Sequence, residues 1–441
     1  MSGYTYNHSG SGEREGSVLV LEPSKETTPA DLHLCISNLL TQFQLHLSER
    51  ADHYIGYPHN QNCDHYTALS PLLRFHVNNI GDPFNEGNIG LNSRPFEIGV
   101  LDWFARLWEI EEDQYWGYVT TCGTEANLQA ILLGRELLGD GILYASKESH
   151  YSVFKAARMF KIECQVINAL PNGEIDCEDL KEKLSMNKDK PAIINANIGT
   201  TFKGGVDNLD LIVKALKECQ FTENQFYIHC DAALNGLISP FLHKGPRLSF
   251  KHPIGSISVS GHKLLGCPMP CGVYMTRKKC ISLLSTNIDY IGSLDNTISG
   301  SRSGHAPIFM WYGLSLKGLL GIQRDVLDCL KNARRLRDGL RESRISTLLN
   351  EDGVVVVFER PLDKDFVRHW QLSCTGNLAH VVVMPHVTSK MLDDFLNELV
   401  RKRKCWYGCG GGEPPCVAEE IGASNCACVV HGEGQNGLIV M

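Results

Sequence analysis

The feature that most constrains this chain is a regular alternation of short apolar runs with helical segments between Gly141 and Ser258. The runs are rich in β-branched side chains, as in strands that are buried on both faces. They occupy residues 141–146, 164–167, 192–197, 226–230 and 254–258, and helical spacing separates them at 153–160, 177–184 and 209–218. This alternation predicts an α/β fold with a mainly parallel sheet and helices on both faces, so ligands are expected at the carboxyl ends of the strands.

Further patterns divide the rest of the chain. Apolar residues at helical spacing predict an amphipathic helix over Pro29–Ser48, and another helix that begins at Phe96. A long helical stretch over Ile308–Leu340 is followed by a strand, helix, strand, helix series at 354–359, 363–374, 378–384 and 390–402. We therefore predict four parts: an N-terminal polar segment and helix (1–55), a large ligand-binding domain (56–298), a small C-terminal α/β domain (299–404) and a Cys/Gly-rich flexible tail (405–441).

Charge and hydropathy exclude several classes of partner. The formal net charge of -8 and the scattered lysines and arginines provide no basic surface for nucleic acid. No run of about 18 or more apolar residues predicts a membrane-spanning helix. The first fourteen residues are polar and lack the apolar centre of a secretory signal and the basic amphipathic pattern of a transit peptide. We expect a cytoplasmic protein that acts on a small molecule.

The 17 cysteines do not resemble a disulfide framework, because they are spread over a long chain and several lie in apolar runs. Most are expected to be reduced and buried. Five crowd the tail and leave open a metal or redox element: Cys405, Cys409, Cys416, Cys426 and Cys428. Their irregular spacing lacks the paired C-x-x-C knuckles of a zinc module, so no metal site is predicted.

One lysine closes a predicted strand, in the run Ser258-Val259-Ser260-Gly261-His262-Lys263. A partly desolvated lysine at a strand end has a lowered pKa and can become the neutral amine that forms an imine. The ordinary alternative is a solvated surface lysine. Lys263 alone does not decide between them.

Three other motifs fall on the same expected sheet edge. Asp231 ends the apolar run Tyr227-Ile228-His229-Cys230-Asp231 and is suited to hold a pyridine nitrogen protonated, or simply to cap a helix. Residues 120–127 lead from a loop into a helix whose N-terminus favours a phosphate, although a capping box would look similar. His150 follows another strand and is suited to stacking or proton transfer, or is an ordinary loop histidine. Their joint placement favours the chemical interpretation of all four motifs.

With these motifs the chain resembles the group II pyridoxal-phosphate (PLP)-dependent amino-acid decarboxylases. Within that group it resembles the plant serine decarboxylases and their histidine-decarboxylase-like relatives. The resemblance runs from about Gly56 to Arg403. The matching motifs are Gly56-Tyr57-Pro58, Asn78-Asn79-Ile80-Gly81-Asp82-Pro83, Glu97-Ile98-Gly99-Val100-Leu101-Asp102-Trp103-Phe104, Ser149-His150-Tyr151-Ser152-Val153-Phe154-Lys155, His229-Cys230-Asp231 and Ser258-Val259-Ser260-Gly261-His262-Lys263.

The resemblance implies a PLP-dependent transferase-like fold (fold type I) with PLP as the cofactor. It implies that Lys263 forms the imine, that Asp231 pairs with the pyridinium nitrogen, and that His150 stacks on the ring and contacts the substrate. The phosphate seat that it implies comprises Gly123, Thr124, Ser260 and His262, aided by Thr200. His150, or a tyrosine that the sequence does not assign, would protonate the carbon after decarboxylation.

The resemblance also implies a homodimer with shared active sites, and by analogy the loop Ser299-Gly300-Ser301-Arg302 would reach across the interface. Three residues depart from the family pattern. Thr121 and Ala126 stand where relatives usually have Asn and Gly, near the phosphate turn, and Asn235 is commonly larger and less polar. These positions bear on cofactor affinity and on the choice of substrate.

The expected reaction is decarboxylation of L-serine to ethanolamine and CO2. Three alternatives stay open: decarboxylation of L-histidine to histamine, an aldehyde synthase in which oxygen intercepts the carbanion, and a non-catalytic dimeric paralogue. Pocket shape separates such substrates by only about 1–3 kcal/mol per methylene-sized difference, so the sequence alone does not choose between serine and histidine.

Overall fold

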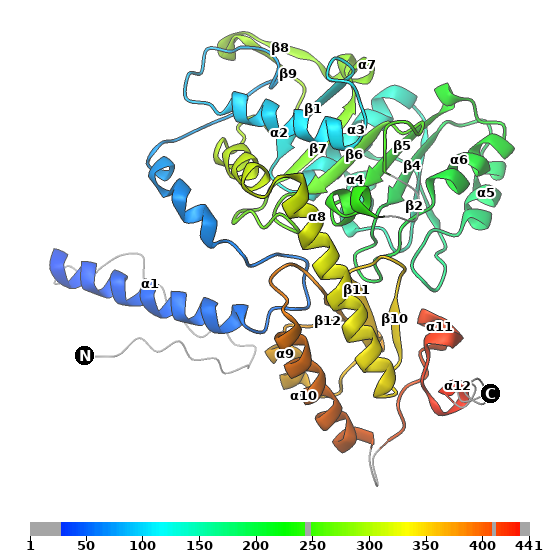
Figure 1. Cartoon of the computed structure of the whole chain (residues 1–441). Helices are drawn as coiled ribbons and strands as arrows, with labels where there is room; N and C mark the ends of the chain where they lie inside the picture. Colours follow the sequence, from blue (N-terminus) through cyan, green and yellow to red (C-terminus); the bar gives the residue numbers. More distant parts are fainter. Residues whose placement is uncertain (1–27, 243–247, 408–411, 433–441) are drawn as a thin grey trace. The chain divides into compact units, whose positions relative to one another are not determined.

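The computed structural model describes residues 28–242, 248–407 and 412–432 (Figure 1). The chain divides into two compact units, Met1–His53 and Tyr54–Met441. The described part of the first unit is helix α1 (Pro29–Ala51), which confirms the predicted amphipathic helix. Thr28 caps this helix by accepting a hydrogen bond from Asp31 N at 3.2 Å. No residue of α1 is buried.

The second unit is built on a seven-stranded sheet. Its strand order is β1-β7-β6-β5-β4-β2-β3, in which only β7 runs antiparallel to its neighbours. The strands are β1 (Tyr115–Thr120), β2 (Ile142–Ser146), β3 (Cys164–Ile167), β4 (Ala192–Asn197), β5 (Phe226–Asp231), β6 (Ser256–Ser260) and β7 (Gly272–Arg277). The five predicted strands are confirmed to within two residues at each end. β1 and β7 were not predicted.

Helices cover both faces of this sheet, as predicted (Figure 1). Successive strand residues point to opposite faces, so Ile142 and Tyr144 pack with α5 and α6, whereas Leu143 and Ala145 pack with α3 and α4. The helices are α2 (Arg94–Leu107), α3 (Gly123–Leu138), α4 (Tyr151–Phe160), α5 (Cys177–Met186), α6 (Leu209–Glu218) and the short α7 (Lys278–Ile281). The 3₁₀ helix η1 (Asp64–Arg74) and the ribbon of β8 (Thr286–Ile288) with β9 (Ser293–Asp295) lie outside this core pattern.

The long helix α8 (His305–Glu342) leads from the large sheet to a smaller one (Figure 1). It confirms the predicted helical stretch and breaks at Gly318, whose φ of 58° and ψ of 179° are not helical. The smaller sheet is antiparallel, in the order β10-β11-β13-β12. Its elements are β10 (Thr347–Leu349), β11 (Val355–Glu359), α9 (Lys364–His369), β12 (Ser373–Thr375), β13 (Leu378–Val382) and α10 (Ser389–Tyr407).

Two predictions for the C-terminal region are wrong. The helix expected over 363–374 ends at His369, because Gln371 takes a left-handed backbone conformation (φ 50°) and the chain then forms β12. In the predicted flexible tail (405–441), residues 405–407 instead continue α10, and residues 412–432 pack on the main hydrophobic core. This second segment contains α11 (Ala418–Ile421), η7 (Ala423–Asn425) and α12 (Val429–Gly432), and Val417 and Ile421 join the main hydrophobic core.

Among the described residues, no helix combines the length and the apolar character that crossing a membrane requires.

Candidate active site

A cavity of about 300 Å³ brings together all eight predicted catalytic and cofactor-binding residues. It lies where β2, β4, β5 and β6 end, which is the sheet edge expected for an α/β fold. The predicted residues that line it are Gly123, Thr124, His150, Thr200, Asp231, Ser260, His262 and Lys263. Ten further residues complete the wall: Tyr57, Pro58, His59, Cys122, Asn127, Tyr151, Asn197, Gly199, Thr201 and Ala233.

Lys263 lies three residues after the end of β6, in the turn that leads away from the sheet. Its side chain lines the cavity together with Asp231. Burial lowers the pKa of the Lys263 amine, and the nearby Asp231 charge opposes part of this shift. Because the lowered pKa favours the neutral amine, Lys263 is suited to attack a carbonyl carbon.

Asp231 is the last residue of β5, and its carboxylate is held in place from two sides. Asn127 Nδ2 donates a hydrogen bond to Asp231 Oδ2 at 2.7 Å, and the backbone N–H of Ala233 donates to Oδ1 at 3.2 Å. The carboxylate is largely buried and still lines the cavity. It therefore offers a fixed acceptor to a cationic N–H group of a bound molecule.

Asn127 in α3 uses all of its hydrogen-bonding capacity. Its Nδ2 also donates to Ser152 Oγ at 3.0 Å, and its Oδ1 accepts from Ser258 Oγ at 3.2 Å and lies 3.0 Å from His229 Nε2. Burial lowers the pKa of His229 to about 4, so this imidazole is neutral and Nε2 carries the proton that Asn127 accepts. In the sequence, Asn127 fits only a possible capping box, although its position four residues after Gly123 places it on the same helix face.

His150 caps helix α4 through its side chain. Its Nδ1 accepts a hydrogen bond from Ser152 N at 3.3 Å and lies 2.7 Å from Ser152 Oγ. Burial lowers the pKa of His150, which favours the neutral ring, and acceptance at Nδ1 leaves the proton on Nε2. His150 can therefore present a single N–H donor to a molecule in the cavity.

The start of α3 is suited to hold an anion. Its N-cap residue, Cys122, makes no side-chain hydrogen bond to the first helical N–H groups, which remain available to a ligand. A Cβ at Gly123 would lie 2.8 Å from Ser260 Oγ, so only glycine allows this close approach. Thr200 Oγ1 accepts a hydrogen bond from Gly205 N at 2.8 Å, which leaves its hydroxyl proton to donate.

Residues from the segment before η1 form another wall that the sequence analysis did not assign to the site. Tyr57, Pro58 and His59 line the cavity, and His59 Nδ1 lies 2.6 Å from the hydroxyl of Tyr54. This segment is attached to the smaller sheet, where the backbone N–H of Val382 donates to the carbonyl of Ile55 at 2.8 Å. The family motif Gly56-Tyr57-Pro58 is the only sequence feature that marks this segment. Its composition does not indicate that it contacts the cavity.

Asn197 at the end of β4 is a second asparagine that sequence reasoning missed. Asp207 holds it in place by accepting hydrogen bonds from Asn197 N and Nδ2 at 2.7 and 2.9 Å. Burial raises the pKa of Asp207 to about 7. The carboxylate of Asp207 does not line the cavity and acts on it only through Asn197.

The three departures from the family pattern lie in different surroundings. The N–H and the hydroxyl of Thr121 both donate to Glu125 Oε2, at 2.7 and 2.5 Å. The side chain of Ala126 is buried in a core cluster rather than at the phosphate turn. Asn235 does not line the cavity: it packs beneath Gly199, where an added Cβ would lie 2.9 Å from Asn235 Cγ. Ala126 and Asn235 therefore bear on the cavity only through the residues that they pack against.

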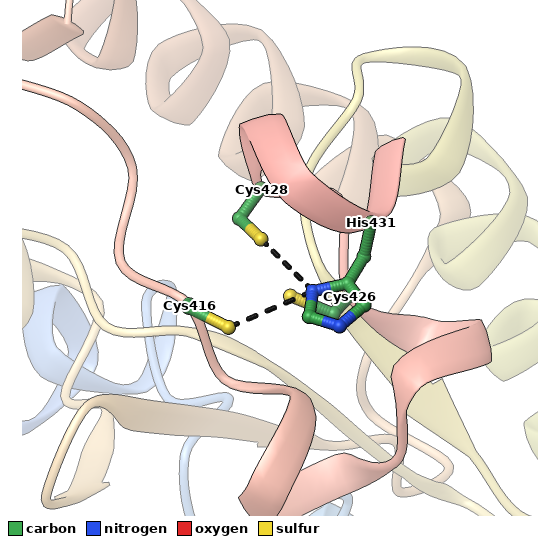
Figure 2. Close-up of side chains that lie close together, drawn as sticks. All are labelled: Cys416, Cys426, Cys428 and His431. Carbon is green, nitrogen blue, oxygen red and sulfur yellow. Dashed lines mark hydrogen bonds between the residues drawn. The ribbon is translucent and has the colours of Figure 1, made fainter. Parts of the chain in front are cut away.

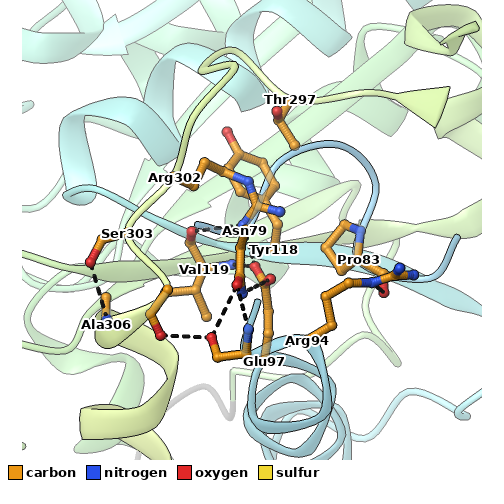
Figure 3. A network of polar contacts seen from close by, with 12 residues as sticks. Asn79, Pro83, Arg94, Glu97, Tyr118, Val119, Thr297, Arg302, Ser303 and Ala306 are labelled. Carbon is orange, nitrogen blue, oxygen red and sulfur yellow. Dashed lines mark hydrogen bonds and ion pairs between the residues drawn. The ribbon is translucent and has the colours of Figure 1, made fainter. Parts of the chain in front are cut away.

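Arg302 ends the loop Ser299-Gly300-Ser301-Arg302, and its side chain points into its own chain (Figure 3). Its guanidinium lies inside its own chain, where it forms an ion pair with the buried Glu97 and donates to the carbonyl of Gly81 at 2.9 Å. It also lies over the ring of Tyr118, 5.1 Å from the centroid. These contacts bury Arg302 within its own chain, whereas Ser301 beside it is exposed.

Comparisons with known proteins agree with this architecture. The family described as "Pyridoxal-dependent decarboxylase conserved domain" matches residues 92–360. Serine decarboxylase 1 of Oryza sativa subsp. japonica is 56% identical over 416 residues, covering 94% of this chain and 86% of that protein. Histidine decarboxylase of Solanum lycopersicum is 54% identical over 392 residues, covering 88% and 94%.

The solved structure of L-methionine decarboxylase from Streptomyces sp. 590 has the same fold, with a TM-score of 0.79. Its sequence is 24% identical, and the match covers 86% of this chain and 97% of that one. The predicted fold class is thereby confirmed.

Proposed function

This chain belongs to the pyridoxal-dependent decarboxylase family, and from that premise we propose that it converts L-serine into ethanolamine and CO2. The reaction breaks the bond between the α-carbon and the carboxylate and adds one proton to that carbon. The enzyme is thus a PLP-dependent amino-acid decarboxylase, for which serine is the proposed substrate.

The residues of the cavity fit the cofactor. The uncapped start of α3 with Thr124, Ser260, His262 and Thr200 would hold the phosphate. The fixed carboxylate of Asp231 suits a protonated ring nitrogen, and the amine of Lys263 would hold the aldehyde carbon covalently. When bound, PLP supplies a ring that withdraws the negative charge left on the substrate carbon.

The protein's own groups orient the reactants and move protons. Asn127 and the Ala233 N–H keep the Asp231 carboxylate aimed into the cavity, so no solvent reorganisation is needed during the reaction. His150, with its proton on Nε2, is the donor that we propose to contact the substrate. We propose that the proton added to the α-carbon comes from His150 in its doubly protonated form, which then returns to the neutral ring, or from Tyr57 or Tyr151, which also line the cavity.

Sequence identity is the observation that carries the choice of serine. Three serine decarboxylases of Oryza sativa subsp. japonica are 56%, 52% and 49% identical to this chain. The polar lining of the cavity, which includes Asn197 and Thr201, suits a hydroxyl group.

Histidine is the second candidate, because the Solanum lycopersicum relative that carries that name is 54% identical. An assay with L-serine and L-histidine, with mass detection of both amines, distinguishes the two. We expect kcat/KM for serine to exceed that for histidine by at least about tenfold. Faster histamine formation would contradict the proposal, and release of hydrogen peroxide with ammonia would identify an aldehyde synthase instead.

We further propose that the enzyme is a cytoplasmic homodimer with shared active sites. Helix α1 exposes six large apolar side chains that a partner subunit would cover: Leu34, Ile36, Leu40, Phe43, Leu45 and Leu47. The cysteines within the described ranges are all unbridged, as is usual in a reducing compartment such as the cytoplasm.

Light scattering on the pure protein measures its molar mass and so tests the dimer. Replacement of Leu40 and Phe43 by serine should shift the equilibrium toward the monomer. An unchanged molar mass would exclude α1 from the interface.

A further inference from the structure

Three cysteines and one histidine near the C-terminus direct their ligand atoms toward one another (Figure 2). One ligand atom from each of Cys416, Cys426, Cys428 and His431 lies within 4.8 Å of all the others. His431 Nδ1 is 3.2 Å from Cys428 Sγ and 3.7 Å from Cys416 Sγ. None of the three cysteines forms a disulfide. Four soft or borderline ligands therefore converge on one point.

We propose that these four residues bind one Zn²⁺ ion. Zinc prefers tetrahedral sites with Zn–S distances of about 2.3 Å and Zn–N distances of about 2.0–2.1 Å, which places the ligand atoms roughly 3.5–3.8 Å apart. The observed separations reach these values after shifts of about 1 Å or less. Three thiolates and one imidazole select zinc over magnesium or calcium, and four protein ligands are typical of a structural site rather than a catalytic one.

The site corrects the expectation that the irregular cysteine spacing excludes zinc. Cys426, Cys428 and His431 come from one short stretch, whereas Cys416 is brought back to them by the turn that contains α11 and η7. Cys405 is exposed on α10 and lies outside the cluster. Cys409, the fifth cysteine of the tail, lies outside the described residues.

The segment that the ion would organise is short and has little regular secondary structure. Within residues 412–432, no helix exceeds four residues, and isolated helices of that length do not form in water. Its anchors are the buried Val417 and Ile421 and a hydrogen bond from Ala427 N to Ser346 Oγ at 2.9 Å. A structural zinc contributes folding free energy directly, which compensates for a small apolar core.

The same segment supports the wall of the active-site cavity. Lys203 Nζ donates a hydrogen bond to the carbonyl of Glu420 in α11 at 2.9 Å and forms an ion pair with Glu148 at 3.3 Å. Lys203 belongs to the turn that contains Thr200, which lines the cavity. Bound zinc would therefore hold α11 as a support behind this turn.

Metal analysis of the full-length enzyme, purified without chelators, tests the proposal. We expect about one zinc ion per chain in the wild-type protein and in the matched control Cys405→Ser. Cys416→Ser and Cys428→Ser should lose most of this zinc; Cys416 is exposed, so its replacement disturbs packing least. Absence of zinc after incubation with Zn²⁺, or equal zinc content in all variants, would overturn the proposal. A disulfide between two of the clustered cysteines, found by mass spectrometry, would also overturn it.

Cobalt substitution and proteolysis test the geometry without any variant. Co²⁺ in the site should give the intense visible bands of a tetrahedral ion and the near-ultraviolet charge-transfer bands of thiolate ligands. Chelation should loosen the backbone of α11, so that a glutamate-specific protease cleaves faster after Glu419 and Glu420, and added Zn²⁺ should restore protection. Octahedral cobalt spectra, or cleavage rates that do not respond to chelation and zinc, would contradict the proposal.

Discussion

Asn127 in α3 donates a 2.7 Å hydrogen bond to the carboxylate of Asp231 at the end of β5, 104 residues away in sequence. The same amide group donates to Ser152 Oγ, which in turn lies 2.7 Å from His150 Nδ1. One side chain therefore orients both the proposed partner of the cofactor nitrogen and the histidine that we propose to face the substrate. This gives Asn127 a positioning role in the site.

Replacement of Asn127 by alanine should lower kcat by about 10- to 100-fold, because it removes a hydrogen bond to a charged group worth about 1.5–3 kcal/mol. The visible absorbance of bound cofactor should also shift, since Asp231 loses its anchor. Asn332→Ala is the matched control, because Asn332 is half-buried in α8 and bonds to the carbonyl of Val387 away from the cavity. Equal kcat values for the two variants would refute the positioning role.

Replacement of Lys263 by alanine should abolish turnover and the visible absorbance of covalently held cofactor. The reason is that the lowered pKa of Lys263 provides the neutral amine needed for the covalent bond. Absorption spectra and amine production measure both effects. Lys251→Ala, at an exposed lysine paired with Glu109, should retain both properties. Survival of the absorbance band and of turnover in Lys263→Ala would show that the assignment is wrong.

Replacement of Gly123 by alanine should weaken PLP binding by about tenfold, or about 1.4 kcal/mol. The new Cβ would lie 2.8 Å from Ser260 Oγ and would push apart two parts of the proposed phosphate seat. Titration of cofactor-free protein with PLP gives the dissociation constant. Gly90→Ala serves as the control, because no atom lies within 4 Å of the added Cβ. Unchanged affinity in Gly123→Ala would place the phosphate elsewhere.

Acid should destabilise the protein through His229, whose pKa burial lowers to about 4 from its ordinary value near 6.5. The unfolded chain takes up a proton between these pH values that the folded chain does not, so the free energy of unfolding falls as the pH drops from 6.5 to 4. Near pH 5 this group contributes a slope of about 1.4 kcal/mol per pH unit. Urea unfolding of His229→Gln between pH 4.5 and 7 should show a slope smaller by about one proton; an unchanged slope would contradict the assignment.

The buried ion pair of Arg302 and Glu97 should couple strongly in unfolding experiments. Arg302→Met leaves the Glu97 carboxylate buried without its cation, and breaking such a pair costs about 3–5 kcal/mol. The double variant with Glu97→Gln should recover part of this loss. Urea unfolding of the two single variants and the double variant measures the coupling. Strictly additive effects would show that the pair acts only through its separate contacts.

The sequence was sufficient for the parallel part of the large sheet and for the residues at its carboxyl edge. The run from Phe226 to Asp231 shows why: a buried parallel strand is apolar throughout, and a carboxylate at its end is conspicuous. β1 and β7 were missed because each contains aromatic and glycine residues without a clear strand period, and β7 runs against its neighbours. Their place in the sheet is set by long-range pairing.

Other parts of the site depend on contacts that no local pattern encodes. In the sequence, Asn127 is an ordinary residue in the first turns of a helix. Only the folded chain brings it into hydrogen-bond contact with Asp231 and His229. In the sequence, Arg302 lies in a segment with loop composition, which predicts an exposed side chain. In the folded chain it is buried in an ion pair with Glu97. Sequence patterns identify residues with chemical potential, whereas the partners of those residues depend on the tertiary fold.

The attachment of the Tyr57–His59 wall to the smaller sheet bears on how a new substrate preference could be engineered. Because Val382 N holds the carbonyl of Ile55, substitutions in β13 that never touch a ligand can move this wall relative to the residues on the large sheet. Mutant libraries restricted to the cavity lining would omit these positions. A search for variants that accept bulkier amino acids should therefore randomise β13 together with the lining residues.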